Sequence, residues 1–191
     1  MWVALWLTTH SPLRFDELLL PQNLRDALFS ASMEGDPPHL LISGPTGCGK
    51  TTAWKLVARQ VLGPGWEATH HVLQARDLAG SSGAMGKFEE FLKGGSDSSS
   101  TLANRTSLDA FDRSLWETNS SDPPPGGEEI DLQDGRIPIS RLIIIEDADH
   151  IGMKRQAYLR RMMEKSGKTS RFILVARSPS RIIDALRSRT R

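Results

Sequence analysis

A glycine-rich segment, GPTGCGKT, runs from Gly44 to Thr51 and leaves the chain few possible folds. It fits the pattern G-x-x-x-x-G-K-[ST] at every fixed position. The glycines let the backbone wrap so that its N–H groups surround a phosphate, while Lys50 reaches the terminal phosphates and the Thr51 hydroxyl ligates Mg²⁺. This chemistry needs a strand before the loop and a helix after it, so that the helix N-terminus points at the anion.

The flanking sequence supplies both elements. HLLISG (39–44) predicts a short buried strand, and AWKLVARQVLG (53–63) predicts an amphipathic helix closed by Gly63. The alternative is a glycine-rich turn that contains a lysine by chance, and such a turn would not require a strand before it and a helix after it. The segment therefore indicates nucleotide binding. We assign the binding positions to Gly44, Pro45, Thr46, Gly47, Cys48, Gly49, Lys50, Thr51 and Thr52.

The single cysteine, Cys48, occupies a free position of the motif, and we interpret it as a small filler rather than a nucleophile. One cysteine excludes an internal disulfide and agrees with a reducing compartment. The apolar opening MWVALWL lacks a basic region, and no run reaches the roughly 18 apolar residues of a membrane span. We therefore expect a cytoplasmic protein, or a nuclear one in a eukaryote, with no membrane partner.

A second signal lies in LIIIEDADHI (142–151), where an aliphatic run ends in Glu146, Asp147 and Asp149. A phosphate-loop protein needs an acid at the end of a neighbouring strand to hold Mg²⁺. A hydrolase also needs a carboxylate that orients water, and this cluster offers one. The alternative is a buried strand followed by a solvated acidic turn.

The remaining pattern alternates helices with strands. Helical spacing spans 14–38, with Pro21 at its start and Gly35 to Pro38 as its stop, and 153–165 predicts another helix. Strands are predicted at 70–75, 139–149 and 171–177, and a short helix within 178–191. This order predicts an α/β fold, a P-loop NTPase parallel sheet flanked by helices.

Charge is distributed unevenly along the chain. Residues 94–136 lose periodicity, and we expect a mobile, disordered acidic insertion there with one short helix around 108–116. Residues 77–134 hold twelve Asp and Glu against four Lys and Arg, whereas 154–191 hold twelve Lys and Arg against two acids. The basic end fits either a polyanionic partner or a solvated face.

With these parts in order, the chain resembles the small subunits of replication factor C, the sliding-clamp loader, which are AAA+ ATPases. The blocks that carry the resemblance are LWLTTHSPLRFDELLLPQNLRDAL, PHLLISGPTGCGKTT, LQARDL and EDADHIGMKRQAYLRRMMEKSGKTSRFILVARSPSRIIDALRSRT. The last block is the most specific, because a generic P-loop protein has no reason to contain it. Together the blocks cover nearly half of the chain.

The resemblance implies ATP and Mg²⁺ as cofactors and a role for each matching position. Lys50 and Thr51 fall on the phosphate and Mg²⁺ ligands. Glu146 stands where the family has its Mg²⁺-associated Asp, so it is an expected metal ligand and catalytic residue, and Asp147 stands where it has the catalytic Glu. The two acids are thus interchanged relative to the family.

Two further positions complete the implied site. Arg177 falls at sensor 1, normally a neutral polar residue, and Arg189 occupies the arginine-finger position that acts in trans on a neighbour's ATP. Asp147 is one methylene shorter than Glu, and a displacement of about 1 Å can cost about a hundredfold in rate. We therefore predict firm ATP binding with slow or absent hydrolysis.

The family also implies partners: other clamp-loader subunits, a sliding clamp, and primer–template DNA held through its backbone. Candidate DNA contacts are Lys154, Arg155, Arg160 and Arg161, which otherwise are solvent-exposed helix charges. Residues 1–191 are expected to form one AAA+ nucleotide-binding domain, with 94–136 as an insertion and the lid and collar domains absent. A fragment and a reduced homologue both fit.

The sequence is compatible with three functions. The leading one is a clamp-loader ATPase subunit that opens a sliding clamp and loads it on DNA. The second is a non-hydrolysing structural or switch subunit that donates Arg189 to its neighbour. A small-molecule P-loop kinase is disfavoured, because it has no use for LRRMMEK and SRT.

Overall fold

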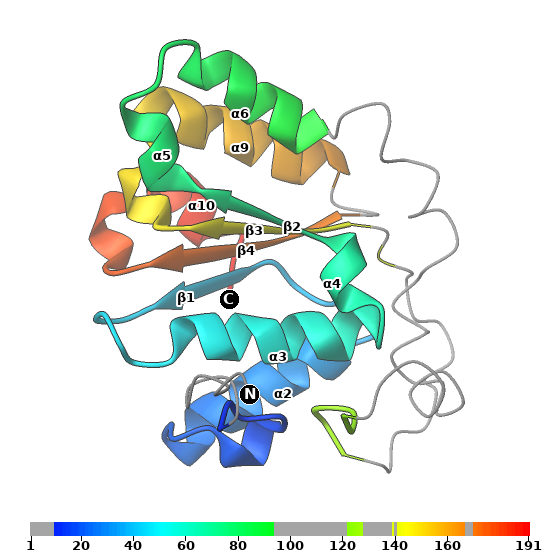
Figure 1. Cartoon of the computed structure of the whole chain (residues 1–191). Helices are drawn as coiled ribbons and strands as arrows, with labels where there is room; N and C mark the ends of the chain where they lie inside the picture. The colour runs from blue at the N-terminus through cyan, green and yellow to red at the C-terminus, as the bar shows by residue number, and fades with distance from the viewer. Residues whose placement is uncertain (1–9, 94–121, 128–138, 140, 167–169) are drawn as a thin grey trace, which may run out of the picture.

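The computed structural model describes residues 10–93, 122–127, 139, 141–166 and 170–191. Within these residues, parallel strands form one sheet in the order β1-β4-β3-β2 (Figure 1). The strands are β1 (Leu40–Ser43), β2 (His70–Gln74), β3 (Arg141–Glu146) and β4 (Ser170–Ala176). The predicted parallel sheet flanked by helices is confirmed.

Helices cover both faces of the sheet. α2 (Gln22–Met33) and α3 (Lys50–Leu62) lie on one face, and α5 (Ala75–Ala79), α6 (Ala84–Lys93), α9 (Met153–Ser166) and α10 (Asp184–Arg187) lie on the other (Figure 1). Alternation along β3 serves both layers: Leu142 and Ile144 pack toward α3, whereas Ile143 and Ile145 pack toward α9. The continuous aliphatic run follows from this two-sided burial.

Short helical turns complete the order: η1 (Phe15–Glu17), α4 (Trp66–Thr69), η3 (Ala148–His150) and η4 (Pro179–Arg181). The helices α4, α5 and α6 were not predicted from the sequence. Among the described residues, no helix combines the length and the apolar character needed to cross a bilayer.

All four strands point the same way, so their carboxyl ends lie along one edge of the sheet (Figure 1). In register, Gln74 on β2 pairs with Glu146 on β3, and Ser43 on β1 pairs with Ala176 on β4. This edge therefore gathers the phosphate loop after β1, the acids after β3 and Arg177 after β4.

The part of the predicted insertion that the structure describes, residues 122–127, contacts the domain. The Phe15 N–H donates to the carbonyl oxygen of Pro125 at 3.1 Å. The Gly126 N–H donates to Gln60 Oε1 at 2.7 Å, and the buried Arg59 guanidinium reaches the carbonyl of Pro123 at 3.0 Å. Residues 122–127 are thus held against the end of α3, while the helix predicted around 108–116 lies outside the described residues.

Candidate functional site

The phosphate loop connects β1 to α3 in a conformation that needs glycine. Gly47 and Gly49 have φ angles of +83° and +87°, which L side chains rarely adopt. Gly49 immediately precedes α3, whose first residue is Lys50. The first N–H groups of a helix have no partner within it, so those of α3 are available to an anion at the loop.

Lys50 lies across its own loop. Its Nζ donates to the carbonyl oxygens of Gly44 at 2.8 Å and Pro45 at 2.6 Å. A cleft of about 450 Å³ opens beside it. The residues that line the cleft are Thr46, Gly47, Gly49, Lys50, Thr51, Thr52, Glu146, Asp147, Val175 and Arg177.

The Glu146 carboxylate accepts hydrogen bonds from three uncharged side chains. Thr51 Oγ1 lies 3.3 Å from Oε1, and the indole Nε1 of Trp54 lies 2.8 Å from the same oxygen. Gln74 Nε2 donates to Oε2. The phosphate loop and the acidic strand end, far apart in the sequence, therefore meet directly.

Asp147 meets a cation instead. Its Oδ2 lies 3.0 Å from Nε of Arg76, which follows β2. Asp147 has a φ of 50°, in the left-handed region that is uncommon for residues other than glycine. This backbone turn ends β3 and sends the chain into η3, so the carboxylates of Glu146 and Asp147 meet different neighbours.

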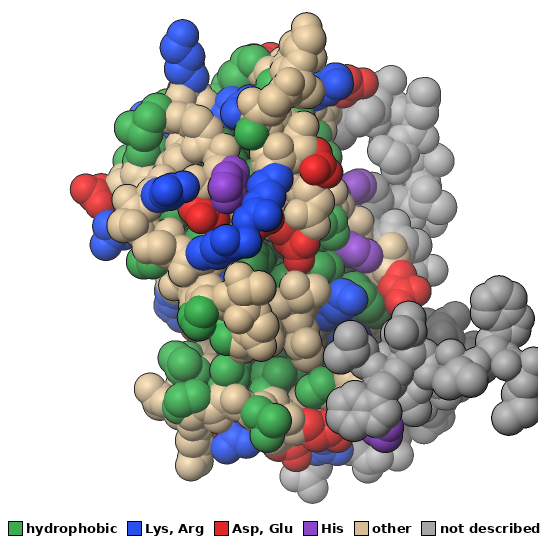
Figure 2. Space-filling view, turned by 60° about the vertical axis from the view of Figure 1, so that its left-hand side comes forward, with side chains coloured by type: hydrophobic (Ala, Val, Ile, Leu, Met, Phe, Trp, Pro, Cys, Tyr) green, Lys and Arg blue, Asp and Glu red, His purple; other side chains and the backbone are tan. Residues whose placement is uncertain are grey.

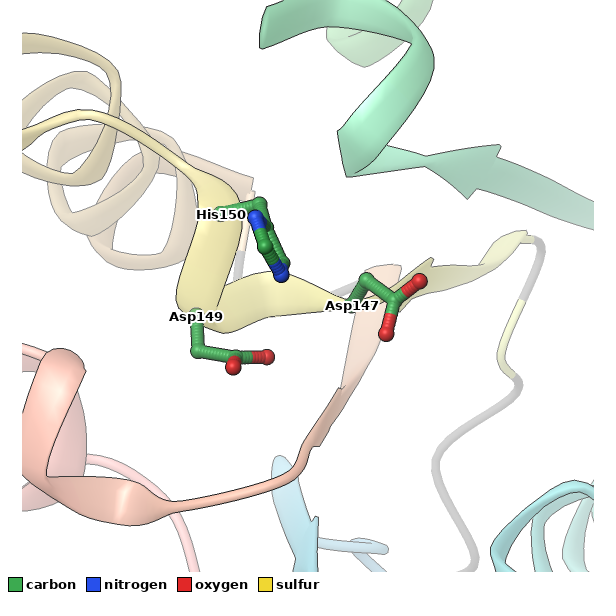
Figure 3. A group of neighbouring side chains, drawn as sticks. All are labelled: Asp147, Asp149 and His150. Atoms are coloured by element: carbon green, nitrogen blue, oxygen red, sulfur yellow. The ribbon is translucent and has the colours of Figure 1, made fainter. Parts of the chain in front are cut away.

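Asp147, Asp149 and His150 come from this one turn, and their ligand atoms lie within 4.8 Å of one another (Figure 3). Asp149 is almost buried, and its Oδ1 accepts the backbone N–H of Arg177 at 3.4 Å. It therefore links the turn after β3 to the end of β4. Because both carboxylates have such partners, the cluster by itself indicates no separate metal site.

The edge that carries the strand ends is mixed in charge. Figure 2 shows basic and acidic side chains next to one another across the middle of this face, with hydrophobic side chains below them. An apolar cavity of about 410 Å³ adjoins the phosphate loop and shares Cys48, Gly49 and Lys50 with it. Its wall is formed mainly by residues of α2 and β1, among them Leu24, Leu28 and Leu40.

Arg189 lies apart from the residues that line the cleft. Its Nη2 is 2.5 Å from Glu164 Oε1, and its Nη1 donates to the carbonyl oxygen of Ala185 at 2.6 Å. Arg160 also approaches Glu164, at 3.7 Å. The structure thus brings together Lys50, Thr51, Glu146, Asp147 and Arg177, and places Arg189 on the α9–α10 surface.

Three residues of the site were not predicted from the sequence: Trp54, Gln74 and Arg76. Trp54 follows Thr51 by three positions on a helix, so the two share a face, and this spacing was a usable signal. Gln74 and Arg76 lie in LQARDL, at the end of a predicted strand. Their contacts with the two acids depend on β2 pairing with β3, which no local pattern reveals.

Comparison with known proteins agrees with the resemblance seen in the sequence. No protein-family model matches the chain. The replication factor C small subunit of Methanoculleus marisnigri is 28% identical over 186 residues, which cover 97% of this chain and 46% of that protein. Replication factor C subunit 5 of Schizosaccharomyces pombe is 33% identical over 187 residues, which cover 97% and 49%. The chain is a relative of these replication factor C subunits.

The chain spans about half the length of the replication factor C proteins it matches. Among solved structures, the RuvB Holliday junction branch migration motor of Thermotoga maritima has a TM-score of 0.56 at 17% identity, covering 94% of this chain and 46% of that chain. This likeness shows the fold alone, which is that of a P-loop NTPase domain. The roles of Glu146, Asp147, Arg177 and Arg189 inferred from the replication factor C resemblance stay predictions.

Proposed function

We propose that the chain is the ATP-binding domain of a clamp-loader small subunit. Such a subunit works with others to open a sliding clamp and place it on primer–template DNA. The observation that carries the proposal is the contact between the Thr51 hydroxyl and the Glu146 carboxylate, 3.3 Å apart. It joins the phosphate loop and the acidic strand end in one cleft, in a chain related to replication factor C.

The residues present suit Mg²⁺ and a nucleotide. A hydroxyl and a carboxylate are oxygen ligands of the kind Mg²⁺ prefers, and Lys50 with the loop N–H groups suits phosphates. When bound, the metal ion would offset the negative charge of the phosphates. The apolar cavity lined by α2 and β1 suits a nucleobase, since it adjoins the loop and offers leucine side chains.

Exposed basic side chains suit two of the proposed partners, DNA and a neighbouring subunit. Lys154 and Arg161 are exposed on α9, which suits contact with a phosphate backbone, and such contacts weaken as salt rises. Arg189 is also exposed, with Glu164 as its ion-pair partner. The phosphates of ATP carry more negative charge than the single Glu164 carboxylate. ATP held by a neighbouring subunit would therefore compete with Glu164 for the Arg189 guanidinium.

Equilibrium binding of Mg-ATP tests the proposal. Lys50→Met removes the ammonium that faces the phosphates, and a hydrogen bond to a charged group contributes about 1.5–3 kcal/mol. We expect affinity to fall roughly 10- to 100-fold. Lys55→Met, at an exposed position of the same helix, is the matched control and should bind like the wild type. Equal affinity of both variants would refute the assignment of the loop.

A second candidate is a non-hydrolysing subunit that uses ATP as an assembly switch and lends Arg189 to its neighbour. The Arg76–Asp147 ion pair favours it, because it engages the carboxylate at the water-orienting position. The shorter side chain of Asp147 and the cation at Arg177 act in the same direction. Firm nucleotide binding with little turnover would follow.

A further inference from the structure

We propose that Trp54 is a positioning residue that holds the Glu146 carboxylate against Thr51 and keeps it ready for a metal ion. The inference rests on the proposed function, in which this cleft binds a Mg²⁺–nucleotide complex. It adds a residue outside the phosphate-loop motif, and it assigns different tasks to the two adjacent acids.

Trp54 reaches the site from the helix that the phosphate loop begins. Lys50, Thr51 and Trp54 lie at positions i, i+1 and i+4 of α3, so they project from neighbouring parts of one helix face. The Trp54 side chain is only 3% exposed, and its indole N–H meets Glu146 Oε1 at 2.8 Å. Because an indole N–H can only donate, this contact requires an acceptor such as the carboxylate.

The indole itself is held in place by other rings. Trp54 meets Trp66 edge-on, with ring centroids 6.4 Å apart, and lies 5.7 Å from the His70 ring. Trp66 and His70 stack at 4.9 Å, and His70 Nδ1 lies 2.7 Å from the Trp66 carbonyl oxygen. Aromatic pairs of this kind add stability beyond simple burial. The donor that faces Glu146 therefore has little freedom to move.

A longer acid needs this support. Glutamate has one more rotatable bond than the aspartate expected at this position, so an unsupported carboxylate would sample orientations away from Thr51. Trp54 fixes Oε1 and Gln74 fixes Oε2, which leaves the carboxylate one orientation with the Thr51 hydroxyl 3.3 Å away. Supporting hydrogen bonds of this kind orient metal ligands in many sites.

The charge of the supporting groups matters as much as their position. Trp54, Gln74 and Thr51 are uncharged, so these donors bring no positive charge to Glu146 that would compete with a metal ion. Asp147 faces the Arg76 guanidinium, which offsets its charge. Two neighbouring carboxylates in contrasting environments take different roles. The geometry therefore assigns the metal to Glu146 rather than to Asp147.

The first test measures ATP affinity as a function of Mg²⁺ concentration. Trp54→Phe keeps an aromatic ring but removes the hydrogen-bond donor. The Mg²⁺ midpoint, the concentration that gives half of the full ATP affinity, should rise roughly 3- to 10-fold. The effect is limited to this range because Thr51 and Gln74 still donate to the Glu146 carboxylate. Affinity for ATP in EDTA should not change. Lys55→Met, at an exposed position of the same helix, is the control and should leave the midpoint unchanged.

A double-mutant cycle separates positioning from packing. If Trp54 acts through the carboxylate, Trp54→Phe should have no further effect on the Mg²⁺ midpoint in the Glu146→Ala background. A wild-type midpoint in Trp54→Phe, or an effect of equal size in the Glu146→Ala background, would overturn the proposal.

The hydrogen bond can also be observed without nucleotide. The indole N–H resonance of Trp54, assigned by its loss in Trp54→Phe, should shift upfield and exchange faster with solvent in Glu146→Ala. An unchanged resonance would refute the positioning role. Failure of the wild-type chain to bind ATP at any Mg²⁺ concentration would instead refute the proposed function, so the two failures are distinct.

Discussion

Glu146 and Asp147 are neighbours in the sequence, yet their surroundings differ in charge. Neutral donors hold Glu146, whereas the Arg76 guanidinium lies 3.0 Å from Asp147. The positive φ of Asp147 produces this difference, because it turns the chain out of β3 between one acid and the next. The sequence shows that the two acids are interchanged relative to the family. The fold adds that each acid also has different hydrogen-bond or ion-pair partners.

At this scale we predict that hydrolysis is restrained by a few side chains. Glu146→Asp, Asp147→Glu and Arg177→Asn together restore the residue types that the resemblance implies, and Arg76→Ser removes the cation beside Asp147, the acid predicted to orient water. In the assembled complex, phosphate release from this subunit should rise with the triple change, and roughly tenfold or more again when Arg76→Ser is added. The measurement uses neighbours whose own sites are inactivated.

Two controls accompany this experiment. Arg76→Lys keeps the cation and should not reproduce the gain. Because the ion pair is partly exposed, it contributes no more than about 1 kcal/mol to stability, so Arg76→Ser should leave the melting temperature nearly unchanged. No gain from the four changes together would contradict a restrained site and would favour a subunit that lacks hydrolysis for other reasons.

The elements followed from the sequence wherever local patterns define them. The position of β3 was predicted because a strand buried on both faces needs a continuous aliphatic run. The start of α3 was predicted because the left-handed backbone of the loop before it needs glycines. α6 was missed, although Met85, Phe88, Phe91 and Leu92 show helical spacing. The spacing of Trp54 from Thr51 indicates that it lies near the loop, but its contact with Glu146 depends on how α3 packs against the β2–β3 pair.

The end of α3 also makes tertiary contacts that the residue pattern of the helix does not predict. Buried Arg59 donates to the carbonyl oxygens of Leu13 at 3.1 Å and Pro123 at 3.0 Å, which ties two distant segments to this helix. Arg59→Met leaves both carbonyls without this donor. We expect the free energy of unfolding to fall by about 1–3 kcal/mol, measured by urea denaturation.

Lys55→Met, at an exposed position of α3, is the control for Arg59→Met and should change stability by less than about 0.5 kcal/mol. An equal effect of the two variants would show that residues 122–127 add nothing to the stability of the helix end. If the segment detaches before the rest unfolds, the wild type and Arg59→Met should also differ in the steepness of their urea transitions.

For the whole molecule, the cleft and the predicted arginine finger lie on separate surfaces. Most of the residues predicted to contact the chain's own nucleotide line one cleft at the sheet edge, whereas Arg189 pairs with Glu164 on α9. A parallel sheet places the carboxyl ends of its strands together, so the sequence order alone was enough to predict the gathering. The ion pair of Arg189 with Glu164 was not predictable from the sequence, because it depends on how α10 packs against α9.

We expect Arg189 to act on ATP that a neighbouring subunit holds. In a complex where that neighbour alone can hydrolyse ATP, Arg189→Ala should lower its turnover by about 10³-fold or more, the range known for arginine fingers. The ATP affinity of the altered chain itself should not change, because Arg189 does not line its own cleft. Phosphate release and equilibrium binding measure the two quantities.

Arg187→Ala provides the matched control, since Arg187 lies two positions away, is exposed, and pairs with Asp184 at 3.0 Å. It should leave the neighbour's turnover unchanged. Glu164→Gln weakens the competing ion pair, so the finger should engage more readily and turnover should stay level or rise. Loss of turnover in Glu164→Gln would show that Glu164 orients the guanidinium for the neighbour rather than competing for it. Full turnover in Arg189→Ala would remove the finger role altogether.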